Sequence, residues 1–197
     1  MSSDGFLQLP QAKGTKILCY TFTMQNNSSI FSVWIIPEVK DREYLQNIIN
    51  NLAIKYNSPV FIPHMTLSGD IRLSIDEIEF AVEEIFKNTK PFKIKKTRVN
   101  QSELFFKTVF IEFELDKNLK NLYSLLSGKI RKDDLFAFKP HISLIYKFMP
   151  EEEKLKIIEK LHIKNEFTIG SVMVNKMDPD NYQNVKAWKI VYSKKLL

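Results

Sequence analysis

Hydrophobic and polar positions along the chain follow two periods, one of about two residues and one of about 3.6 residues. Residues 31–35 and 108–112 are short runs rich in β-branched and aromatic side chains, which is typical of strands. Between such runs, apolar residues recur at helical spacing. The pattern therefore predicts strands that alternate with helices.

The predicted order of elements occurs twice. A shift of 77 residues, which takes His64 to His141, also lays residues 31–35 over residues 108–112. The same shift aligns two apolar helix stripes, Leu45, Ile48 and Ile49 with Leu122, Leu125 and Leu126. Each unit reads strand, helix, histidine strand, helix, strand, and a further strand is predicted around residues 187–192.

Capping residues mark the predicted helix boundaries. Ser74 and Glu77 have the form of a capping box, and Asp116 is predicted to be the N-cap of the first helix in the second unit. Gly128 is predicted to end that helix, because glycine is favoured at C′. Pro150 and the glutamates after it are predicted to begin the last helix.

The histidine strands share a short motif, FIPHMTL at residues 61–67 and FKPHISL at residues 138–144. Side chains two positions apart in a strand lie on one face, so His64 is predicted beside Thr66 and His141 beside Ser143. The intervening residues are predicted to point into the apolar core: Met65, Leu67, Ile142 and Leu144.

This duplication predicts an α+β fold of two pseudo-symmetric lobes around a central cleft, each with an antiparallel-rich sheet and helices on its outer face. The lobe-forming repeats cover about residues 31–100 and 103–175 of one bilobal domain, residues 31–197. Residues 1–30 are expected to be an N-terminal extension, in which residues 17–24 could add an edge strand. Pseudo-twofold packing would aim both imidazoles into the cleft.

The composition limits the function classes. With 197 residues, of which 44% are hydrophobic, the chain can bury one substantial core. The net charge of +6 favours anionic ligands such as nucleotides or RNA, although a solvated lysine-rich surface gives the same balance. Cys19 is the only cysteine, and no apolar run approaches the ~20 residues of a membrane span. We expect a cytoplasmic monomer with no membrane partner.

The histidine pair suits the opening of a five-membered cyclic phosphate, which needs a base to activate water and an acid to protonate the departing oxygen. An imidazole can fill either role, because its unperturbed pKa lies near 6.5. The hydroxyls of Thr66 and Ser143 can donate to phosphoryl oxygens. No carboxylate or cysteine recurs with the histidines at ligand spacing, so no metal or cofactor is expected.

These features resemble the two-histidine phosphoesterase superfamily, marked by two H-x-[ST]-x motifs, and within it the plant and yeast type of cyclic phosphodiesterase. The resemblance rests on residues 32–37, on both Pro-His-x-[Thr/Ser]-Leu segments and on residues 143–146, and it runs from about residue 31 to 192. It implies metal-independent hydrolysis of a 2′,3′-cyclic nucleotide, or of ADP-ribose 1″,2″-cyclic phosphate, to a phosphomonoester. By analogy, His141 would activate water, His64 would protonate the leaving oxygen, and Tyr146 would contact the substrate.

Several alternatives remain open from the sequence. The histidines, Thr66 and Ser143 could be ordinary hydrogen-bonded strand residues. Tyr146 would point away from the cleft unless the strand ends or bulges near Ile145. A cluster at residues 105–107 could meet phosphate and stack on a base, or could be core packing beside a solvated lysine. The rival functions are an RNA-processing phosphodiesterase that acts on oligonucleotide ends or 2′,5′ linkages, and a non-catalytic nucleotide-binding module. Trp34 and Trp188 are predicted to be packing residues.

Overall fold

A computed structural model describes residues 29–130 and 138–197 of the chain. Its strands are β1 (Ile30–Pro37), β2 (Met65–Ile71), β3 (Phe92–Gln101), β4 (Val109–Phe113), β5 (His141–Ile145), β6 (Glu166–Met177) and β7 (Lys189–Lys195). Its helices are α1 (Val39–Tyr56), α2 (Ile75–Phe86), α3 (Lys117–Ile130) and α4 (Glu151–Lys160), with 3₁₀ turns η1 (Phe105–Lys107) and η2 (Val185–Ala187). The predicted repeat is confirmed as β1-α1-β2-α2-β3 followed by β4-α3-β5-α4-β6. The edge strand suggested at residues 17–24 lies outside the described residues.

The described strands form one seven-stranded sheet in the order β2-β1-β6-β3-β4-β5, with β7 also paired to β6. Every pair of neighbours is antiparallel. The prediction of an α+β fold with an antiparallel sheet is therefore confirmed.

The strand order mixes the two repeats of the sequence. β6 belongs to the second repeat but pairs with β1, whereas β3 belongs to the first repeat and pairs with β4. The helices cross over in the same way, since α1 contacts β5 and α3 contacts β2. Each group of adjacent strands, β2-β1-β6 and β3-β4-β5, is thus completed by a strand of the other repeat.

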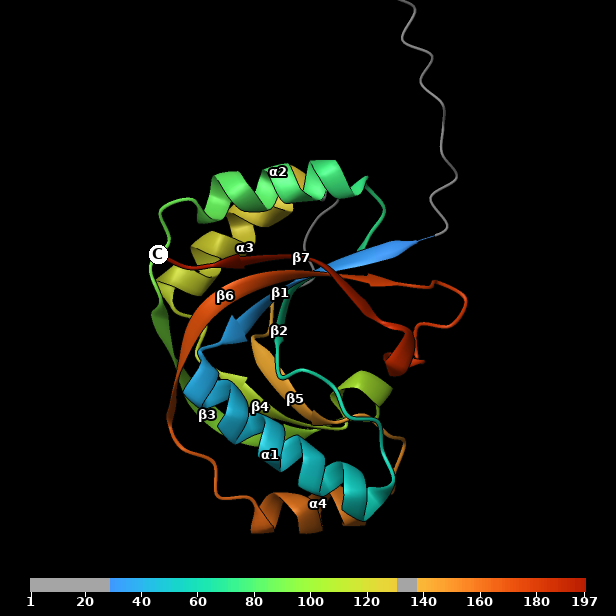
Figure 1. Cartoon of the computed structure of the whole chain (residues 1–197). Helices are drawn as coiled ribbons and strands as arrows, with labels where there is room; N and C mark the ends of the chain where they lie inside the picture. Colours follow the sequence, from blue (N-terminus) through green and yellow to red (C-terminus); the bar gives the residue numbers. More distant parts are fainter. Residues whose placement is uncertain (1–28, 131–137) are drawn as a thin grey trace, which may run out of the picture.

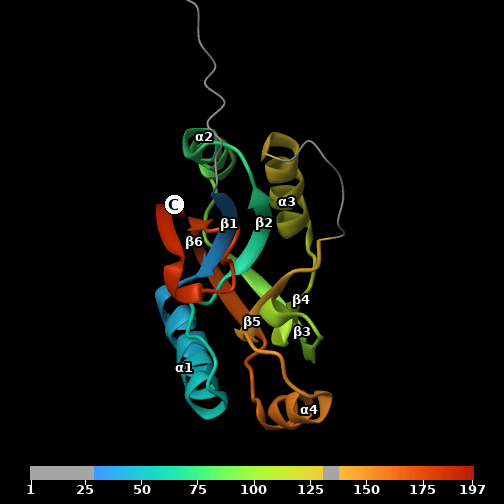
Figure 2. The ribbon, with the colours of Figure 1, turned by 90° about the vertical axis from the view of Figure 1, so that its right-hand side faces the viewer.

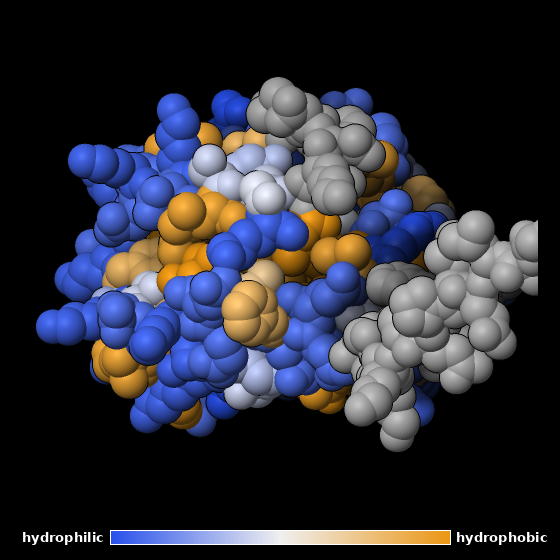
Figure 3. Space-filling model, turned by 90° about the horizontal axis from the view of Figure 1, so that it is seen from above, coloured by the Kyte–Doolittle hydropathy of each residue, from blue (hydrophilic) through white to orange (hydrophobic). Residues whose placement is uncertain are grey.

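The helices lie in two pairs at opposite ends of the curved sheet, α2 with α3 and α1 with α4 (Figures 1 and 2). Seen over α2 and α3, the surface is mostly hydrophilic, with apolar residues along its middle (Figure 3). Phe80 and Leu125 are 66% and 46% exposed, although Leu125 belongs to one of the two apolar helix stripes. The turns η1 and η2 lie together on one side of the sheet, on the right in Figure 1. No described helix has the length and apolar content needed to cross a membrane.

The predicted helix boundaries are confirmed with one exception. Ser74 and Glu77 form the capping box, and the Asp116 carboxylate accepts a hydrogen bond from the backbone N–H of Leu119 at 2.8 Å. Gly128, however, does not end α3, which continues to Ile130. Ile130 is 7% exposed, so its burial favours a longer helix over the local preference of glycine for a C-cap.

The alternation predicted for the histidine strands is confirmed by burial. All four intervening residues are at most 2% exposed and belong to the apolar core: Met65, Leu67, Ile142 and Leu144. Because successive side chains alternate between faces, this packing turns the histidines and hydroxyl residues to the opposite, cavity-lining face.

Candidate active site

The two motifs line a single cavity of about 340 Å³. His64 and Thr66 reach it from β2 and the residue before it, and His141 and Ser143 reach it from β5. These strands belong to different strand groups of the sheet, so the fold brings the duplicated motifs together from residues far apart in sequence.

His64 is held in one orientation by its surroundings. Its Nδ1 lies 2.6 Å from the carbonyl oxygen of Ile62, and because a carbonyl only accepts, Nδ1 carries the hydrogen. The ring stacks on Trp34 with 3.7 Å between ring centroids, and Phe61 meets it edge-on. In the neutral imidazole, Nε2 is therefore left as the free acceptor.

His141 repeats this arrangement. Its Nδ1 donates to the carbonyl oxygen of Lys139 at 2.8 Å, again two residues earlier in the chain. Phe110 lies edge-on to its ring, with 5.5 Å between centroids. The same local hydrogen bond therefore sets the same tautomer in both motifs and leaves both Nε2 atoms available.

Burial lowers the pKa of both histidines. The pKa of His64 falls from 6.5 to about 4, because burial disfavours the imidazolium, and the nearby His141 adds to the effect while the Ile62 carbonyl opposes it. The pKa of His141 is also lowered by burial and by the charge of Lys107, against the opposing effects of the Lys139 carbonyl and the Glu112 carboxylate. The free protein thus holds neutral imidazoles at pH 7.

Tyr146 reaches the cavity because β5 ends at Ile145, so strict alternation no longer applies to it. Its ring stacks on Phe61 with 3.7 Å between centroids, and its hydroxyl oxygen lies 3.5 Å from His64 Nε2. Burial raises the pKa of Tyr146, while a hydrogen bond with Ser143 lowers it less strongly. The phenol therefore stays protonated and can act as a donor.

Ser143 already has a hydrogen-bond acceptor within the protein. Its hydroxyl donates to the carbonyl oxygen of Phe106 in η1 at 2.7 Å. A rotation of the hydroxyl is needed before Ser143 can donate to a bound anion. Thr66 lines the cavity and lies opposite Trp34 in the pairing of β2 with β1.

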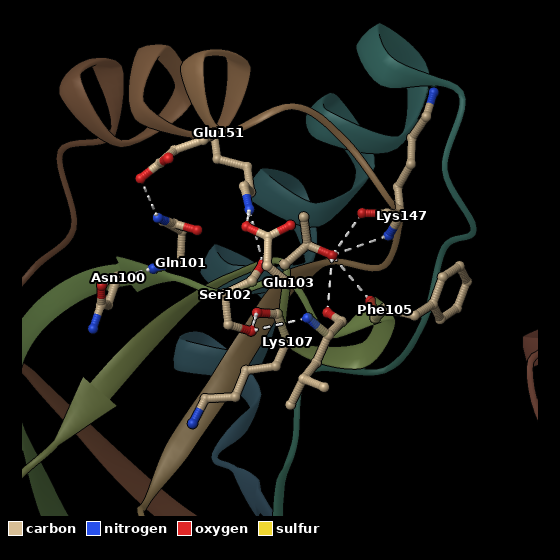
Figure 4. Close-up of polar contacts among 11 residues, drawn as sticks. Asn100, Gln101, Ser102, Glu103, Phe105, Lys107, Lys147 and Glu151 are labelled. Atoms are coloured by element: carbon tan, nitrogen blue, oxygen red, sulfur yellow. Dashed lines mark hydrogen bonds and ion pairs between the residues drawn. The ribbon is translucent and has the colours of Figure 1, made fainter.

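The turn η1 is held by a network of hydrogen bonds (Figure 4). The Thr108 hydroxyl donates to the carbonyl oxygen of Lys147 at 2.7 Å, and the Ser102 hydroxyl donates to the carbonyl oxygen of Lys107 at 2.5 Å. The fully buried ammonium of Lys154 donates to the carbonyl oxygen of Ser102 at 3.0 Å. These bonds set the position of Phe106, and with it the acceptor of the Ser143 hydroxyl.

Besides Tyr146, other aromatic residues line the cavity, and among them the sequence had offered only Phe106 as a base-stacking residue, in the cluster at residues 105–107. Trp34 and Trp188, which were predicted to be packing residues, line the cavity, and so do Phe106 and Tyr182. The rings of Phe106 and Trp188 are 5.7 Å apart, and those of Phe106 and Tyr182 are 5.8 Å apart. Such walls can stack on a nucleobase.

The described residues bring no three histidine, cysteine, aspartate or glutamate side chains together as a metal site. What converges on the cavity is two imidazole Nε2 atoms, a protonated phenol and the hydroxyls of Thr66 and Ser143. These groups can move protons and donate to the oxygens of a phosphate.

Comparison with known proteins agrees with this chemistry. The family model described as cyclic phosphodiesterase-like protein matches residues 30–196. The chain is 22% identical over 168 residues to the cyclic phosphodiesterase of Arabidopsis thaliana, an alignment that covers 82% of this chain and 92% of the relative.

Solved structures share the fold. The protein TT0787 of Thermus thermophilus superimposes with a TM-score of 0.56 at 13% identity, covering 85% of this chain and 97% of that one. Escherichia coli LigT superimposes with a TM-score of 0.54 at 12% identity, covering 86% and 98%. With the match to the family model over nearly all described residues, the chain belongs to the cyclic phosphodiesterase-like family of the two-histidine phosphoesterases and is a phosphoesterase.

Proposed function

We propose that the enzyme hydrolyses a 2′,3′-cyclic nucleotide, or ADP-ribose 1″,2″-cyclic phosphate, to a phosphomonoester, with His64 and His141 as its acid–base pair. One observation carries this proposal. Both imidazoles donate Nδ1–H to a carbonyl two residues earlier, which leaves Nε2 without a hydrogen, and both line one cavity of about 340 Å³; the Tyr146 hydroxyl lies 3.5 Å from Nε2 of His64. A cavity of this size is in the range of small-ligand sites.

In the proposed reaction, one neutral imidazole takes a proton from water, and the water oxygen forms a bond to phosphorus. The ring P–O bond breaks, and the second histidine, as imidazolium, gives its proton to the departing ribose oxygen. Tyr146, Thr66 and, after rotation, Ser143 donate to the phosphoryl oxygens, where negative charge increases. The proton count balances, because one histidine gains the proton that the other loses.

The large downward shift of the His64 pKa, caused by burial, supports His64 as the base and leaves the role of acid to His141. With a pKa of about 4, roughly one His64 ring in a thousand is protonated at pH 7. The pKa of His141 is also lowered, by burial and by Lys107, but the Lys139 carbonyl and the Glu112 carboxylate opposite it in the β4–β5 pairing favour its protonated form. This assignment is the reverse of the one that the family resemblance implied.

A nucleotide substrate is supported by the aromatic walls of the cavity and by the comparisons. The Arabidopsis relative is named a cyclic phosphodiesterase, and E. coli LigT has been crystallised with 3′-AMP. Trp188, Phe106 and Tyr182 line the same cavity as the histidines, and the ring of Phe106 contacts both of the others. A base can stack there while its phosphate lies between the imidazoles.

Phosphorus NMR with adenosine 2′,3′-cyclic phosphate and ADP-ribose 1″,2″-cyclic phosphate tests the proposal. We expect conversion to a phosphomonoester that persists in a chelator and is lost in the double variant His64→Gln, His141→Gln. The position of the product phosphate identifies the bond that breaks. Binding without turnover by pure protein would instead support the non-catalytic module and contradict the proposal.

A further inference from the structure

The charge of Lys107 acts on His141 and is itself close enough to Lys139 for the two charges to repel, and neither lysine lines the cavity. Lys107 belongs to η1, and Lys139 lies two residues before β5. The ammonium of Lys107 lies 4.3 Å from the centre of the Phe110 ring, which also contacts the ring of His141. Lys139 supplies the carbonyl that holds His141. Two lysines therefore lie close to the His141 side of the site, outside the residues that line the cavity.

The nearby carboxylate is already paired. Glu112 accepts hydrogen bonds from Arg98 at 2.6 Å and from Asn100 at 3.0 Å. In the part of the chain that the structure describes, neither Lys107 nor Lys139 has a carboxylate within 4 Å. Lys107 is also half-buried; burial lowers its pKa, the more distant Glu112 carboxylate opposes this, and the charge of Lys139 adds to the lowering. A partly desolvated cation in this setting gains from a bound anion.

The anion is not the reacting phosphate. That group must contact both Nε2 atoms inside the cavity, whereas Lys107 and Lys139 are not among the residues that line it. The two lysines thus suit a second anionic group of the same substrate, one that extends out of the cavity beside His141.

On this basis we propose that Lys107 and Lys139 bind a phosphate carried on the 5-hydroxyl of the same ribose that bears the cyclic phosphate. The inference rests on the proposed function and narrows its substrate class. ADP-ribose 1″,2″-cyclic phosphate and an RNA end with a 2′,3′-cyclic phosphate share this group, and a simple nucleoside 2′,3′-cyclic phosphate lacks it.

The turn that carries Lys107 is fixed before any substrate arrives. In Figure 4 the side chain of Lys107 points away from the hydrogen bonds that hold its backbone. Its carbonyl accepts from Ser102, and its N–H donates to the carbonyl of Leu104 at 2.9 Å. Only the side chain has to adjust on binding, which keeps the entropic penalty small.

The test compares kcat/KM for adenosine 2′,3′-cyclic phosphate with and without a 5′-phosphate. We expect the 5′-phosphate to raise kcat/KM about tenfold in the unmodified protein, and less at high salt, as for a partly exposed charge pair. Lys107→Gln and Lys139→Gln should each reduce this ratio, and the double variant should bring it close to one. Lys95→Gln is the matched control, because it removes an exposed lysine that pairs with Glu114 on the sheet.

A second measurement does not depend on turnover. Calorimetry should show that adenosine 2′,5′-bisphosphate binds more tightly than adenosine 2′-monophosphate, and that the double variant loses the difference. A ratio near one in the unmodified protein, or a ratio that survives in a double variant with an unchanged melting temperature, would overturn the inference. Absence of hydrolysis of every cyclic phosphate, with the binding difference intact, would contradict the proposed function but not the lysine site.

ADP-ribose 1″,2″-cyclic phosphate and a short oligoribonucleotide with a 2′,3′-cyclic end serve as further arms of the same assay. Both should lose kcat/KM in the double lysine variant, and failure of both to do so would overturn the inference. Both compounds carry the 5-phosphate that Lys107 and Lys139 bind. The compound with the higher kcat/KM in the unmodified protein therefore shows whether the preferred substrate is an ADP-ribose derivative or an RNA end.

Discussion

Replacing His64 by glutamine tests which histidine is the base. The shift of the His64 pKa from 6.5 to about 4 corresponds to roughly 3 kcal/mol against protonation in the folded protein. An acid must be protonated, and almost no His64 is protonated at pH 7. A base must be neutral, and almost all His64 is neutral at that pH. The unmodified enzyme cannot decide this, because its kcat/KM profile is the same bell whichever histidine is the acid.

The single variants separate the two roles. In His64→Gln the remaining group is His141, so residual kcat/KM should fall as the pH rises through the His141 pKa, since the acid loses its proton. In His141→Gln the residual kcat/KM should rise through the low pKa of His64 and then stay level. Phosphorus NMR over pH 4 to 8 measures both, with the double variant giving the background rate. A residual kcat/KM in His64→Gln that increases with pH would make His141 the base and refute the argument.

Two further predictions concern stability and Tyr146. The folded-state pKa of His64 lies below its unfolded value, so the unfolded state takes up a proton first as the pH falls. The free energy of unfolding should therefore drop by up to about 3 kcal/mol between pH 6.5 and 4. Urea titrations at several pH values measure this drop, and the His64→Gln variant should lack the contribution of His64 to it. Tyr146→Phe keeps the ring stack on Phe61 but removes the hydroxyl 3.5 Å from His64 Nε2. We expect kcat to fall about tenfold, somewhat less than the loss of a fully engaged transition-state donor, with an unchanged melting temperature; unaltered kcat would leave Tyr146 a packing residue.

The sequence predicted the features that depend on local rules. Duplicated motifs and the two-residue period of a strand were enough to put His64 and Thr66 on one face and His141 and Ser143 on another. The tautomers were not predicted, although each Nδ1 bonds a carbonyl only two residues earlier. These bonds are not visible before the backbone path is known.

Features that depend on register and tertiary packing were not predicted. Trp34 faces the cavity because of how β1 pairs with β2, and Trp188 because of the path of the chain after η2. Gly128 lies within α3 because burial of Ile130 outweighs a local preference. The exchange of β3 and β6 between the repeats is a non-local pairing, which no periodicity reveals.

That exchange has a consequence for synthesis of the protein on the ribosome. β6 is among the last strands to be made, yet it lies between β1 and β3 and also holds β7. Until residues 166–177 leave the exit tunnel, one edge of β1 is unpaired. The strands β2-β1 and β3-β4-β5, which carry the two motifs, then lack the strand that joins them in the sheet. The nascent chain therefore has unpaired strand edges until β6 is made. Formation of the complete sheet depends on contacts between residues far apart in sequence, so it is slow relative to helix formation.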